Sequence, residues 1–269
     1  MTERDRGNAD EWRGMLLGTS AWHRWHRRGR GLFGALPSPP RCILCAAPFK
    51  GPFTPVLGFL GRSPHPRNPR YCALCMNVLL SGRGGAEVEL TSLFADVRGS
   101  TPLAEQLGPT GTHTLMDRFY TEGTEILMRS GALIERFMGD QIVGYFVPGY
   151  AGPSHARVAI DAALKLLRAT GNASGVAPWV PIGVGVATGL AFVGSVGSAS
   201  HVDLTALGDP VNIASRLASA AAIGEVLVTL DAATAAGLDL SGLERRELTL
   251  KGRADSTFVV VLSTPHPMS

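Results

Sequence analysis

Apolar and polar residues follow two periods from about residue 87 onward, one typical of strands and one typical of helices. Residues 89–95 alternate and are apolar enough for a buried strand, which ends at Asp96. Thr101 then precedes Pro102, a pairing that favours a helix start. Apolar residues recur at helical spacing as far as Leu127. The pattern therefore predicts a buried strand followed by a long helix.

The same two periods continue to the end of the chain. They predict two hairpins, two helices and three closing strands, in this order: residues 132–138 with 141–147 about Gly139-Asp140, a helix at 153–168, residues 180–187 with 190–196 about Gly189, a helix from Asp209-Pro210 to Gly224, and strands at 226–229, 246–250 and 258–262. The leading order is β-α-α-β-β-α-β. We therefore expect an α+β fold, a ferredoxin-like βαββαβ core with added strands.

Two further segments precede this region. Residues 1–41 are a basic lead with six arginines and no acidic residue from Arg13 to Arg41. We expect a weakly structured linker, with a short amphipathic helix within residues 12–33 that docks on the chain's own surface. Contact of its Trp and Arg residues with a membrane or nucleic acid is the alternative. The prolines of residues 37–40 mark the boundary to a second segment at 42–85.

Composition limits the classes of protein that remain. The chain has 269 residues, 45% of them hydrophobic and 17% charged, as expected for a large globular domain with a small appendage. A net charge of +3 does not by itself indicate a nucleic-acid partner, and we expect none. Residues 169–202 are uncharged apart from His201, but their prolines and glycines argue against a transmembrane segment. With no secretory signal evident, we expect a cytoplasmic protein.

The second segment contains all of the cysteines, as two C-x-x-C pairs. They are Cys42, Cys45, Cys72 and Cys75. Two such pairs supply the four sulfurs of a tetrahedral zinc site, and the surrounding Pro- and Gly-rich segment has few core residues to hold it without one. The role would be structural. A redox or iron–sulfur centre needs the same sulfurs, and buried thiols or disulfides are the alternatives without a metal.

Two carboxylates stand where strands of the predicted core end. Asp96 follows the first strand, and Asp140 lies in the turn of the next hairpin. In a βαββ core these two points are neighbours at one edge of the sheet. Together they can bind Mg²⁺ or Mn²⁺ that also bridges a triphosphate. Between them, the turn at Gly99, Ser100 and Thr101 leads into a helix whose amides can receive phosphate oxygens.

A third candidate pair is Asn212 and Arg216. Their i, i+4 spacing places them on one face near the start of the predicted helix. Asparagine there can orient a sugar, and arginine can stabilise charge that develops on a phosphorus.

Four blocks of sequence resemble the class III adenylate/guanylate cyclase family. They are Phe-Ala-Asp-Val-Arg-Gly-Ser-Thr at 94–101, Met-Gly-Asp at 138–140, Leu-Gly-Asp-Pro-Val-Asn-Ile-Ala-Ser-Arg-Leu at 207–217 and Leu-Lys-Gly at 250–252. The blocks occur in the family's order and at its spacing, which implies a catalytic domain over residues 86–265. The segment before it is similar to bacterial members with paired cysteines ahead of that domain.

The resemblance implies a role for each matched residue. Asp96 and Asp140 correspond to the pair that binds two Mg²⁺ or Mn²⁺ ions, with the Val97 carbonyl as a further ligand. Asn212 and Arg216 correspond to the residues that orient the ribose and stabilise the transition state. Lys251 corresponds to a triphosphate contact. The family assembles each site between two subunits, so the resemblance implies a homodimer with two sites.

The positions that read the base depart from the usual pattern. Members that make cyclic AMP usually carry lysine and aspartate where this chain has Arg136 and Thr205. Threonine can still accept a hydrogen bond from the amino group of adenine, and arginine keeps the positive charge of lysine. A guanidinium also suits the O6 and N7 atoms of guanine. We expect ATP as the substrate, with GTP possible.

Two other functions are consistent with the same sequence. One is a catalytically silent cyclase-like domain that binds nucleotide and signals by dimerising, against which the intact Asp96, Asp140, Asn212 and Arg216 argue. The other is a metal-stapled adaptor for nucleic acid or protein in the first part of the chain, with the cyclase as output. The cysteine segment lacks the interleaved aromatic and basic residues that nucleic-acid binding would favour.

Overall fold

The computed structural model describes residues 3–34, 40–66, 68–81, 84–134, 139–173, 177–198, 201–250 and 256–263. Arg136 and Lys251, two of the expected site residues, lie outside these ranges. The chain divides into two compact units that interleave along the sequence. The first comprises residues 1–88, 147–150 and 191–207, and the second comprises 89–146, 151–190 and 208–269.

A mixed sheet forms the centre of the fold, as the α+β prediction requires. Its strands run in the order β4-β5-β3-β6-β8-β10-β9, and β7 pairs with β6. They are β3 (Gly85–Val97), β4 (Leu133–Ile134), β5 (Gln141–Phe146), β6 (Ile182–Ser198), β7 (His201–Leu207), β8 (Glu225–Thr229), β9 (Arg245–Leu248) and β10 (Thr257–Ser263). β6 and β8 are parallel, whereas β3 and β5, β8 and β10, and β9 and β10 are antiparallel.

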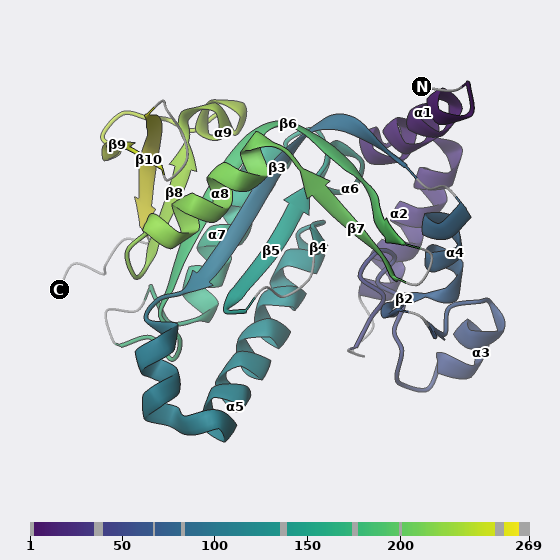
Figure 1. Ribbon diagram of the computed structural model, residues 1–269, viewed down its shortest axis with the longest axis horizontal. Coiled ribbons are helices and arrows are strands. Elements are labelled where there is room, and N and C mark those ends of the chain that lie inside the picture. Colours follow the sequence, from purple (N-terminus) through teal and green to yellow (C-terminus); the bar gives the residue numbers. More distant parts are fainter. Residues whose placement is uncertain are drawn as a thin grey trace. The chain divides into compact units, whose positions relative to one another are not determined.

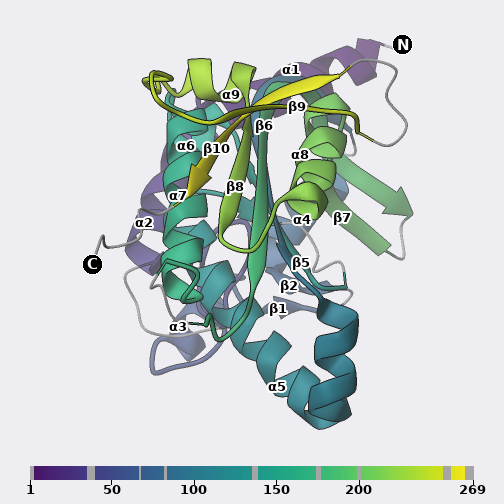
Figure 2. The ribbon, with the colours of Figure 1, turned by 90° about the vertical axis from the view of Figure 1, so that its left-hand side faces the viewer.

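Helices cover both faces of the sheet in the second unit. The helices of this unit are α5 (Ser100–Arg129), α7 (His155–Ala169), α8 (Asp209–Ala220) and α9 (Leu230–Ala235). Leu93, Ile142 and Val184 pack with apolar residues of α5, α7 and α9 in the main core. Leu217 of α8 packs with Leu227 and Val259 in a second, smaller cluster. Figure 2 shows α7 and α8 on opposite sides of β6 and β8.

The helix starts differ slightly from those expected. Gly99 and Gly208 are the N-cap residues of α5 and α8, so Thr101 and Asp209 lie inside their helices and do not cap them. α5 is bent at Gly108, which has a φ of 67° and a ψ of 174° and is followed by Pro109, and the bend is visible in Figure 1. Proline cannot donate the helical hydrogen bond, so a kink at this point is expected.

The predicted hairpin about Gly189 is wrong. β6 continues through this residue as a single strand from Ile182 to Ser198, and its antiparallel partner is β7. Glycine is common in turns, but it also occurs within strands. A Cβ at Gly189 would lie 3.6–3.8 Å from the ring of Pro210, an ordinary van der Waals distance, so the strand leaves room for a side chain here.

The start of the first unit contains helices, where we expected a weakly structured linker. It contains α1 (Glu3–Leu17), α2 (Ala21–Gly34), α3 (Thr54–Phe59), β1 (Pro64–His65), β2 (Asn68–Cys72) and α4 (Ala73–Ser81), and the short α6 (Pro148–Ala151) overlaps it. Trp12, Met15 and Leu16 of α1 are buried. A Cβ at Gly149 would lie 2.6 Å from the carbonyl oxygens of Met15 and Leu16. The described part of the lead therefore contains two helices, and α1 packs closely on this glycine.

No helix in the described part of the chain is both long enough and apolar enough to span a membrane.

Candidate functional site

The two candidate metal-binding aspartates are neighbours at one edge of the sheet. β3 and β5 pair in a register that sets Asp96 opposite Gln141, and the Val97 amide donates a 3.1 Å hydrogen bond to the Asp140 carbonyl. Gly139, which precedes Asp140, has a φ of 64°, a conformation that glycine adopts without strain. The sheet therefore brings together the backbones of two aspartates that are separated by a long helix in the sequence.

The Asp96 carboxylate is nearly buried, with 5% of the residue exposed, and both of its oxygens have partners. The Arg98 guanidinium forms an ion pair with Oδ1. The Gln141 side-chain amide donates to Oδ2 at 2.5 Å, and the Ser219 hydroxyl donates to the same oxygen at 3.3 Å. Arg98 also donates to the Ser219 carbonyl at 2.5 Å. Asp96 is thus held in one orientation by groups from the turn after β3, from β5 and from α8.

The turn after Asp96 leads directly into the N-terminus of α5. Gly99 has a φ of 65° and caps the helix, and Ser100 and Thr101 form its first turn. The first amides of a helix have no partner within the helix, so they point toward an incoming anion. The helix start lies where the sequence predicts phosphate contacts at Gly99, Ser100 and Thr101, and those contacts stay predictions.

Tyr120 of α5 supports the turn that carries Asp140. Its hydroxyl donates a hydrogen bond to the Gly139 carbonyl. Burial raises the pKa of Tyr120 above its ordinary value, and the negative charge of Asp140 raises it further. The phenol therefore stays protonated and remains a donor at neutral pH.

Asn212 and Arg216 lie on α8, as the sequence predicts. Asn212 is exposed and Arg216 is half-buried, while the opposite side of the helix buries Ala214 and Leu217. Among the described residues, no hydrogen bond or ion pair joins Asn212 or Arg216 to Asp96 or Asp140 of the same chain. The pair is thus available to a ligand outside the helix.

Glycines on β6 fix how closely α8 approaches the sheet. A Cβ at Gly185 would lie 2.1 Å from the Ala214 carbonyl oxygen and 2.4 Å from the Ala218 amide nitrogen. A Cβ at Gly183 would lie 2.9 Å from Ala221. Side chains at these positions would push the helix away, so the glycines determine where Asn212 and Arg216 stand.

The remaining residues expected to contact the nucleotide are Thr205, Arg136 and Lys251. Thr205 lies on β7 in the first unit, where it is half-buried and stands opposite Gly194 in the β6–β7 register. Its two companions in the sequence prediction, Arg136 and Lys251, lie outside the described residues. The roles of all three in binding a nucleotide stay predictions.

Three residues around Asp96 were missed by the sequence analysis: Arg98, Gln141 and Ser219. Arg98 stands inside the first motif block, and its charge next to a candidate metal ligand was a usable signal. Gln141 follows Asp140 directly, and the β3–β5 register could have indicated it. Ser219 had no signal, because nothing in a helix pattern relates it to a strand 123 residues earlier.

The four cysteines form a separate cluster in the first unit. Their Sγ atoms all lie within 4.8 Å of one another, each residue is buried, and none forms a disulfide. The structure therefore brings together the two C-x-x-C pairs that the sequence predicts to share one metal ion.

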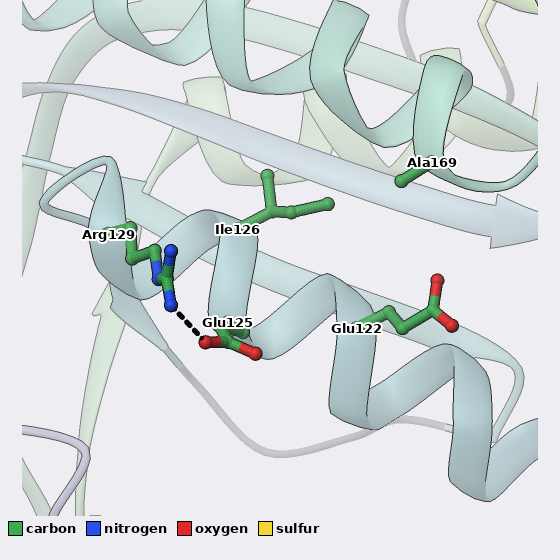
Figure 3. Close-up of a pocket in the computed structure, with 5 residues that line it drawn as sticks. All are labelled: Glu122, Glu125, Ile126, Arg129 and Ala169. Carbon is green, nitrogen blue, oxygen red and sulfur yellow. Dashed lines mark hydrogen bonds and ion pairs between the residues drawn. The ribbon is translucent and has the colours of Figure 1, made fainter. Parts of the chain in front are cut away.

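An open depression on α5 contains none of the expected site residues. It has a volume of about 300 Å³ and is lined by Glu122, Glu125, Ile126, Arg129 and Ala169. Figure 3 shows the Arg129 guanidinium paired with Glu125, at 2.6 Å, and the Glu122 carboxylate directed elsewhere. Glu125 and Arg129 form an exposed i, i+4 ion pair, which is typical of a solvated helix surface.

Comparison with known proteins gives a match to one family model. Residues 86–263 match the model described as adenylate and guanylate cyclase catalytic domain. A relative described as adenylate cyclase, from Anabaena cylindrica, is 29% identical over 132 residues, which is 48% of this chain and 26% of that protein. The match thus spans about a quarter of the length of that relative.

Solved structures agree with this match. The guanylyl cyclase Cya2 superposes with a TM-score of 0.60 at 25% identity, over 68% of this chain and 96% of that one. The adenylyl cyclase CyaB from P. aeruginosa superposes with a TM-score of 0.57 at 26% identity, over 69% of this chain and 99% of that one. Both comparisons cover nearly the whole of the known chain and leave about a third of the present one unmatched.

Proposed function

Because the chain belongs to the adenylate and guanylate cyclase catalytic domain family, we propose that it converts ATP into 3′,5′-cyclic AMP and pyrophosphate as a homodimer. The observation that carries this proposal is the placement of Asp96 and Asp140 at one edge of the sheet, beside the N-terminus of α5. The ribose 3′-oxygen would bond to the α-phosphorus as the bond to pyrophosphate breaks, and the 3′-hydroxyl proton would pass to solvent water. We expect the reaction to occur in the cytoplasm.

The donor set at this edge fits a hard divalent cation. Two carboxylates, with the Val97 carbonyl beside them, offer only oxygen ligands, which Mg²⁺ and Mn²⁺ prefer. When bound, two such ions would acidify the 3′-hydroxyl and neutralise charge on the phosphates. Asp96, Val97 and Asp140 would hold them.

Arg98 has a specific task in this proposal. Its guanidinium pairs with Oδ1 of Asp96, so it would have to release that oxygen for a cation to bind there. Gln141 and Ser219 donate to the other oxygen and would keep Asp96 oriented as Arg98 moves aside. Preorganised ligands of this kind lose little entropy when the cation binds.

The phosphates would lie against the start of α5, where the amides of Gly99, Ser100 and Thr101 offer hydrogen-bond donors. Lys251 would add a positive charge to the triphosphate. Both contacts would leave the 3′-hydroxyl and the α-phosphorus close to each other, which is the main contribution a protein makes to such a transfer.

The homodimer is proposed because, within the described residues, neither Asn212 nor Arg216 forms a hydrogen bond or ion pair with Asp96 or Asp140 of its own chain. Both lie on the accessible side of α8. Supplied by a second copy, Asn212 would orient the ribose and Arg216 would stabilise charge on the α-phosphoryl group. Leu207 and Val196 on β7 and β6 are exposed apolar residues that a second copy would cover.

ATP is preferred over GTP on the chemistry of the base-reading residues. Thr205 can accept a hydrogen bond from the amino group of adenine, and Arg136 keeps the charge of the lysine found in cyclases that make cyclic AMP. The Anabaena relative carries the name adenylate cyclase. The superposition on a guanylyl cyclase makes GTP the second candidate.

The test is turnover of ATP and of GTP, measured separately, by the purified full-length chain with Mn²⁺, alongside Asp96→Ala. Cyclic AMP that disappears in the variant supports the proposal. Cyclic GMP would keep the mechanism and reverse the base preference. No product from either nucleotide, in a preparation shown to be dimeric, would contradict catalysis and favour a silent signalling domain.

Mixing two inactive variants tests the shared site. Asp96→Ala and Arg216→Ala remove residues that, in the proposed dimer, belong to the same site but to different chains. A mixture of the two variants would contain heterodimers with one intact site, so it should regain activity that neither variant has alone. No recovery in mixed, refolded dimers would contradict a site assembled from two chains.

A further inference from the structure

The cysteine cluster has the dimensions of a single tetrahedral metal site. Cys45 Sγ and Cys72 Sγ, from different C-x-x-C pairs, are 3.7 Å apart. With Zn–S bonds of about 2.3 Å, the edge of a ZnS₄ tetrahedron is about 3.8 Å. A disulfide requires about 2.0 Å, so this contact is not one. The two pairs therefore meet at the separation that one shared ion demands.

We propose that Cys42, Cys45, Cys72 and Cys75 bind one zinc ion as a structural tetrathiolate centre, balanced in charge by Arg30 and Arg62, and that this centre fixes β2 and through it β7. The proposal is independent of cyclase activity, because none of these residues belongs to the catalytic site.

The backbone at the first C-x-x-C pair, Cys42 and Cys45, forms a turn that suits a shared metal ion. Ala46, directly after Cys45, has a φ of 61°, the one positive value at a non-glycine residue among those described. Its amide donates to the Cys42 carbonyl at 2.8 Å, and the Cys42 amide donates to the Ala47 carbonyl at 2.9 Å. A strained residue of this kind persists only where its surroundings require it. The resulting turn directs both thiols to the same side.

Hydrogen bonds to sulfur indicate that the thiols act as acceptors. The Cys72 amide donates to Cys42 Sγ at 3.3 Å, and the Arg62 guanidinium donates to Cys45 Sγ at 3.0 Å. A thiolate accepts such bonds far better than a thiol does. Donors aimed at ligand sulfurs are the usual outer support of a thiolate metal centre.

Two arginines offset the charge of the centre. Four thiolates around a divalent ion leave two surplus negative charges in a buried place, where unpaired charge is costly. Arg62 contacts a ligand sulfur directly. Arg30 is 7% exposed and donates to the Leu44 carbonyl, inside the first C-x-x-C pair, at 2.9 Å. A buried arginine at this place is explained by a negative centre beside it.

The same dimensions argue against a two-iron cluster. A two-iron cluster divides its four cysteines between two metal atoms, which spreads the sulfurs farther than a site in which all lie within 4.8 Å. A single iron would fit the geometry. Zinc binds such sites more tightly than Fe²⁺ and needs no redox partner. All four ligands come from the protein, which leaves no open position for chemistry.

The centre has a route to the sheet through β2, which ends at Cys72. Three side chains of β2 converge on Asp203 of β7, a buried carboxylate. Asn68 and Tyr71 donate to its Oδ1 at 3.3 and 3.1 Å, and Arg70 forms an ion pair with it at 3.5 Å. The Leu204 amide donates to the Tyr71 hydroxyl at 3.1 Å. Ordering β2 at the metal therefore orders β7.

The first experiment measures metal in the purified full-length wild-type chain. We expect one zinc per chain by elemental analysis, unchanged in the catalytic variant Asp96→Ala. Replacement of zinc with cobalt should give the thiolate-to-cobalt charge-transfer and visible bands of a tetrahedral four-sulfur site. Iron as the native metal, no metal with four freely titratable thiols, or disulfides in the chain as purified would each overturn the proposal.

The arginine part is tested with Arg62→Met, which keeps the packing of the stem and removes the charge. The zinc affinity, measured by competition with a chelator, should fall about 10- to 100-fold, the range found for outer-shell partners of metal ligands. Arg129→Met, at an exposed ion pair on α5, is the matched control and should retain wild-type zinc affinity. Equal zinc affinity in both variants would overturn the role of Arg62.

The link to β7 is read by hydrogen exchange on the wild-type chain before and after chelation. Peptides that contain Leu204 should exchange at least about tenfold faster without zinc, while those from β8 should be unchanged. Equal protection of β7 in both states would overturn the link while leaving the metal site in place.

Discussion

The Gln141 side-chain amide donates a 2.5 Å hydrogen bond to Asp96, the residue that it faces in the β3–β5 register. One contact thus joins a candidate metal ligand to the strand that begins after the second aspartate. Because Gln141 bonds to one carboxylate oxygen, it leaves the other for Arg98 or for a cation.

We expect Gln141→Ala to weaken the catalytic metal site without unfolding the chain. Loss of a group that orients a metal ligand typically costs 10- to 100-fold in metal affinity or activity. The concentration of Mn²⁺ needed for half-maximal cyclase activity should therefore rise by about that factor. The measurement is a Mn²⁺ titration of activity. Glu122→Ala, at an exposed position on α5, serves as the control, and an unchanged titration in Gln141→Ala would contradict the positioning role.

Gly185→Ala should damage both stability and activity. The added Cβ meets backbone atoms of α8 at 2.1–2.4 Å, which cannot give way as a flexible side chain would. Overpacking of this kind costs about 1–3 kcal/mol and would displace the helix that carries Asn212 and Arg216. Urea unfolding and ATP turnover measure the two effects.

Gly189→Ala on the same strand is the matched control for that prediction. Its Cβ would meet Pro210 at 3.6–3.8 Å, an ordinary van der Waals distance. The variant should therefore unfold within about 1 kcal/mol of the wild type. If both variants lost stability equally, close approach of α8 would not be the reason that Gly185 is needed.

The titration of His155 should lower the free energy of unfolding in mild acid. Its ring is nearly buried on α7, where Nδ1 lies 2.9 Å from the Thr91 hydroxyl. Burial lowers the pKa of His155, and the partial opposition of Glu89 does not reverse this. The unfolded chain therefore takes up the proton first as the pH falls below about 6.5, and stability is lost until the pH reaches the folded pKa.

The measurement is the free energy of unfolding in urea between about pH 7.5 and about pH 5.5. His155→Asn keeps a polar group near Thr91 and cannot titrate in this range, so its stability should fall less steeply with acidification. Parallel curves for the wild type and the variant would show that another group carries the pH dependence.

Tyr71→Phe tests the clamp between β2 and β7. The phenol is fully buried, donates to Asp203 and accepts from the Leu204 amide. Its removal leaves a buried amide without this partner and takes one donor from a buried carboxylate, which should cost about 1–3 kcal/mol. Thermal unfolding of the zinc-loaded chain measures the loss. A variant as stable as the wild type would mean that Asn68 and Arg70 suffice to hold Asp203.

Much of the core could be predicted from periodicity, because each element's local pattern agrees with the face it buries. The strand that carries Asp96, the closing strands β8, β9 and β10, and the long helix α5 all follow from their own residues. The pattern failed at Gly189, since a glycine in a turn and a glycine within a continuous strand look the same in one dimension. Which of the two applies depends on β7, whose pairing with residues 192–198 accompanies the continuation of β6 beyond this glycine.

The sequence by itself determined which chemistry is available: the two aspartates, Asn212 and Arg216 at helical spacing, and two C-x-x-C pairs. These are matters of residue type and short spacing, which the chain specifies locally. Only the tertiary structure decided what surrounds them. Gln141 and Ser219 reach Asp96 from 45 and 123 residues away, and Tyr71 reaches Asp203 across 132. Such contacts depend on strand register and helix packing, which come from burial of apolar surface over the whole chain rather than from any short segment.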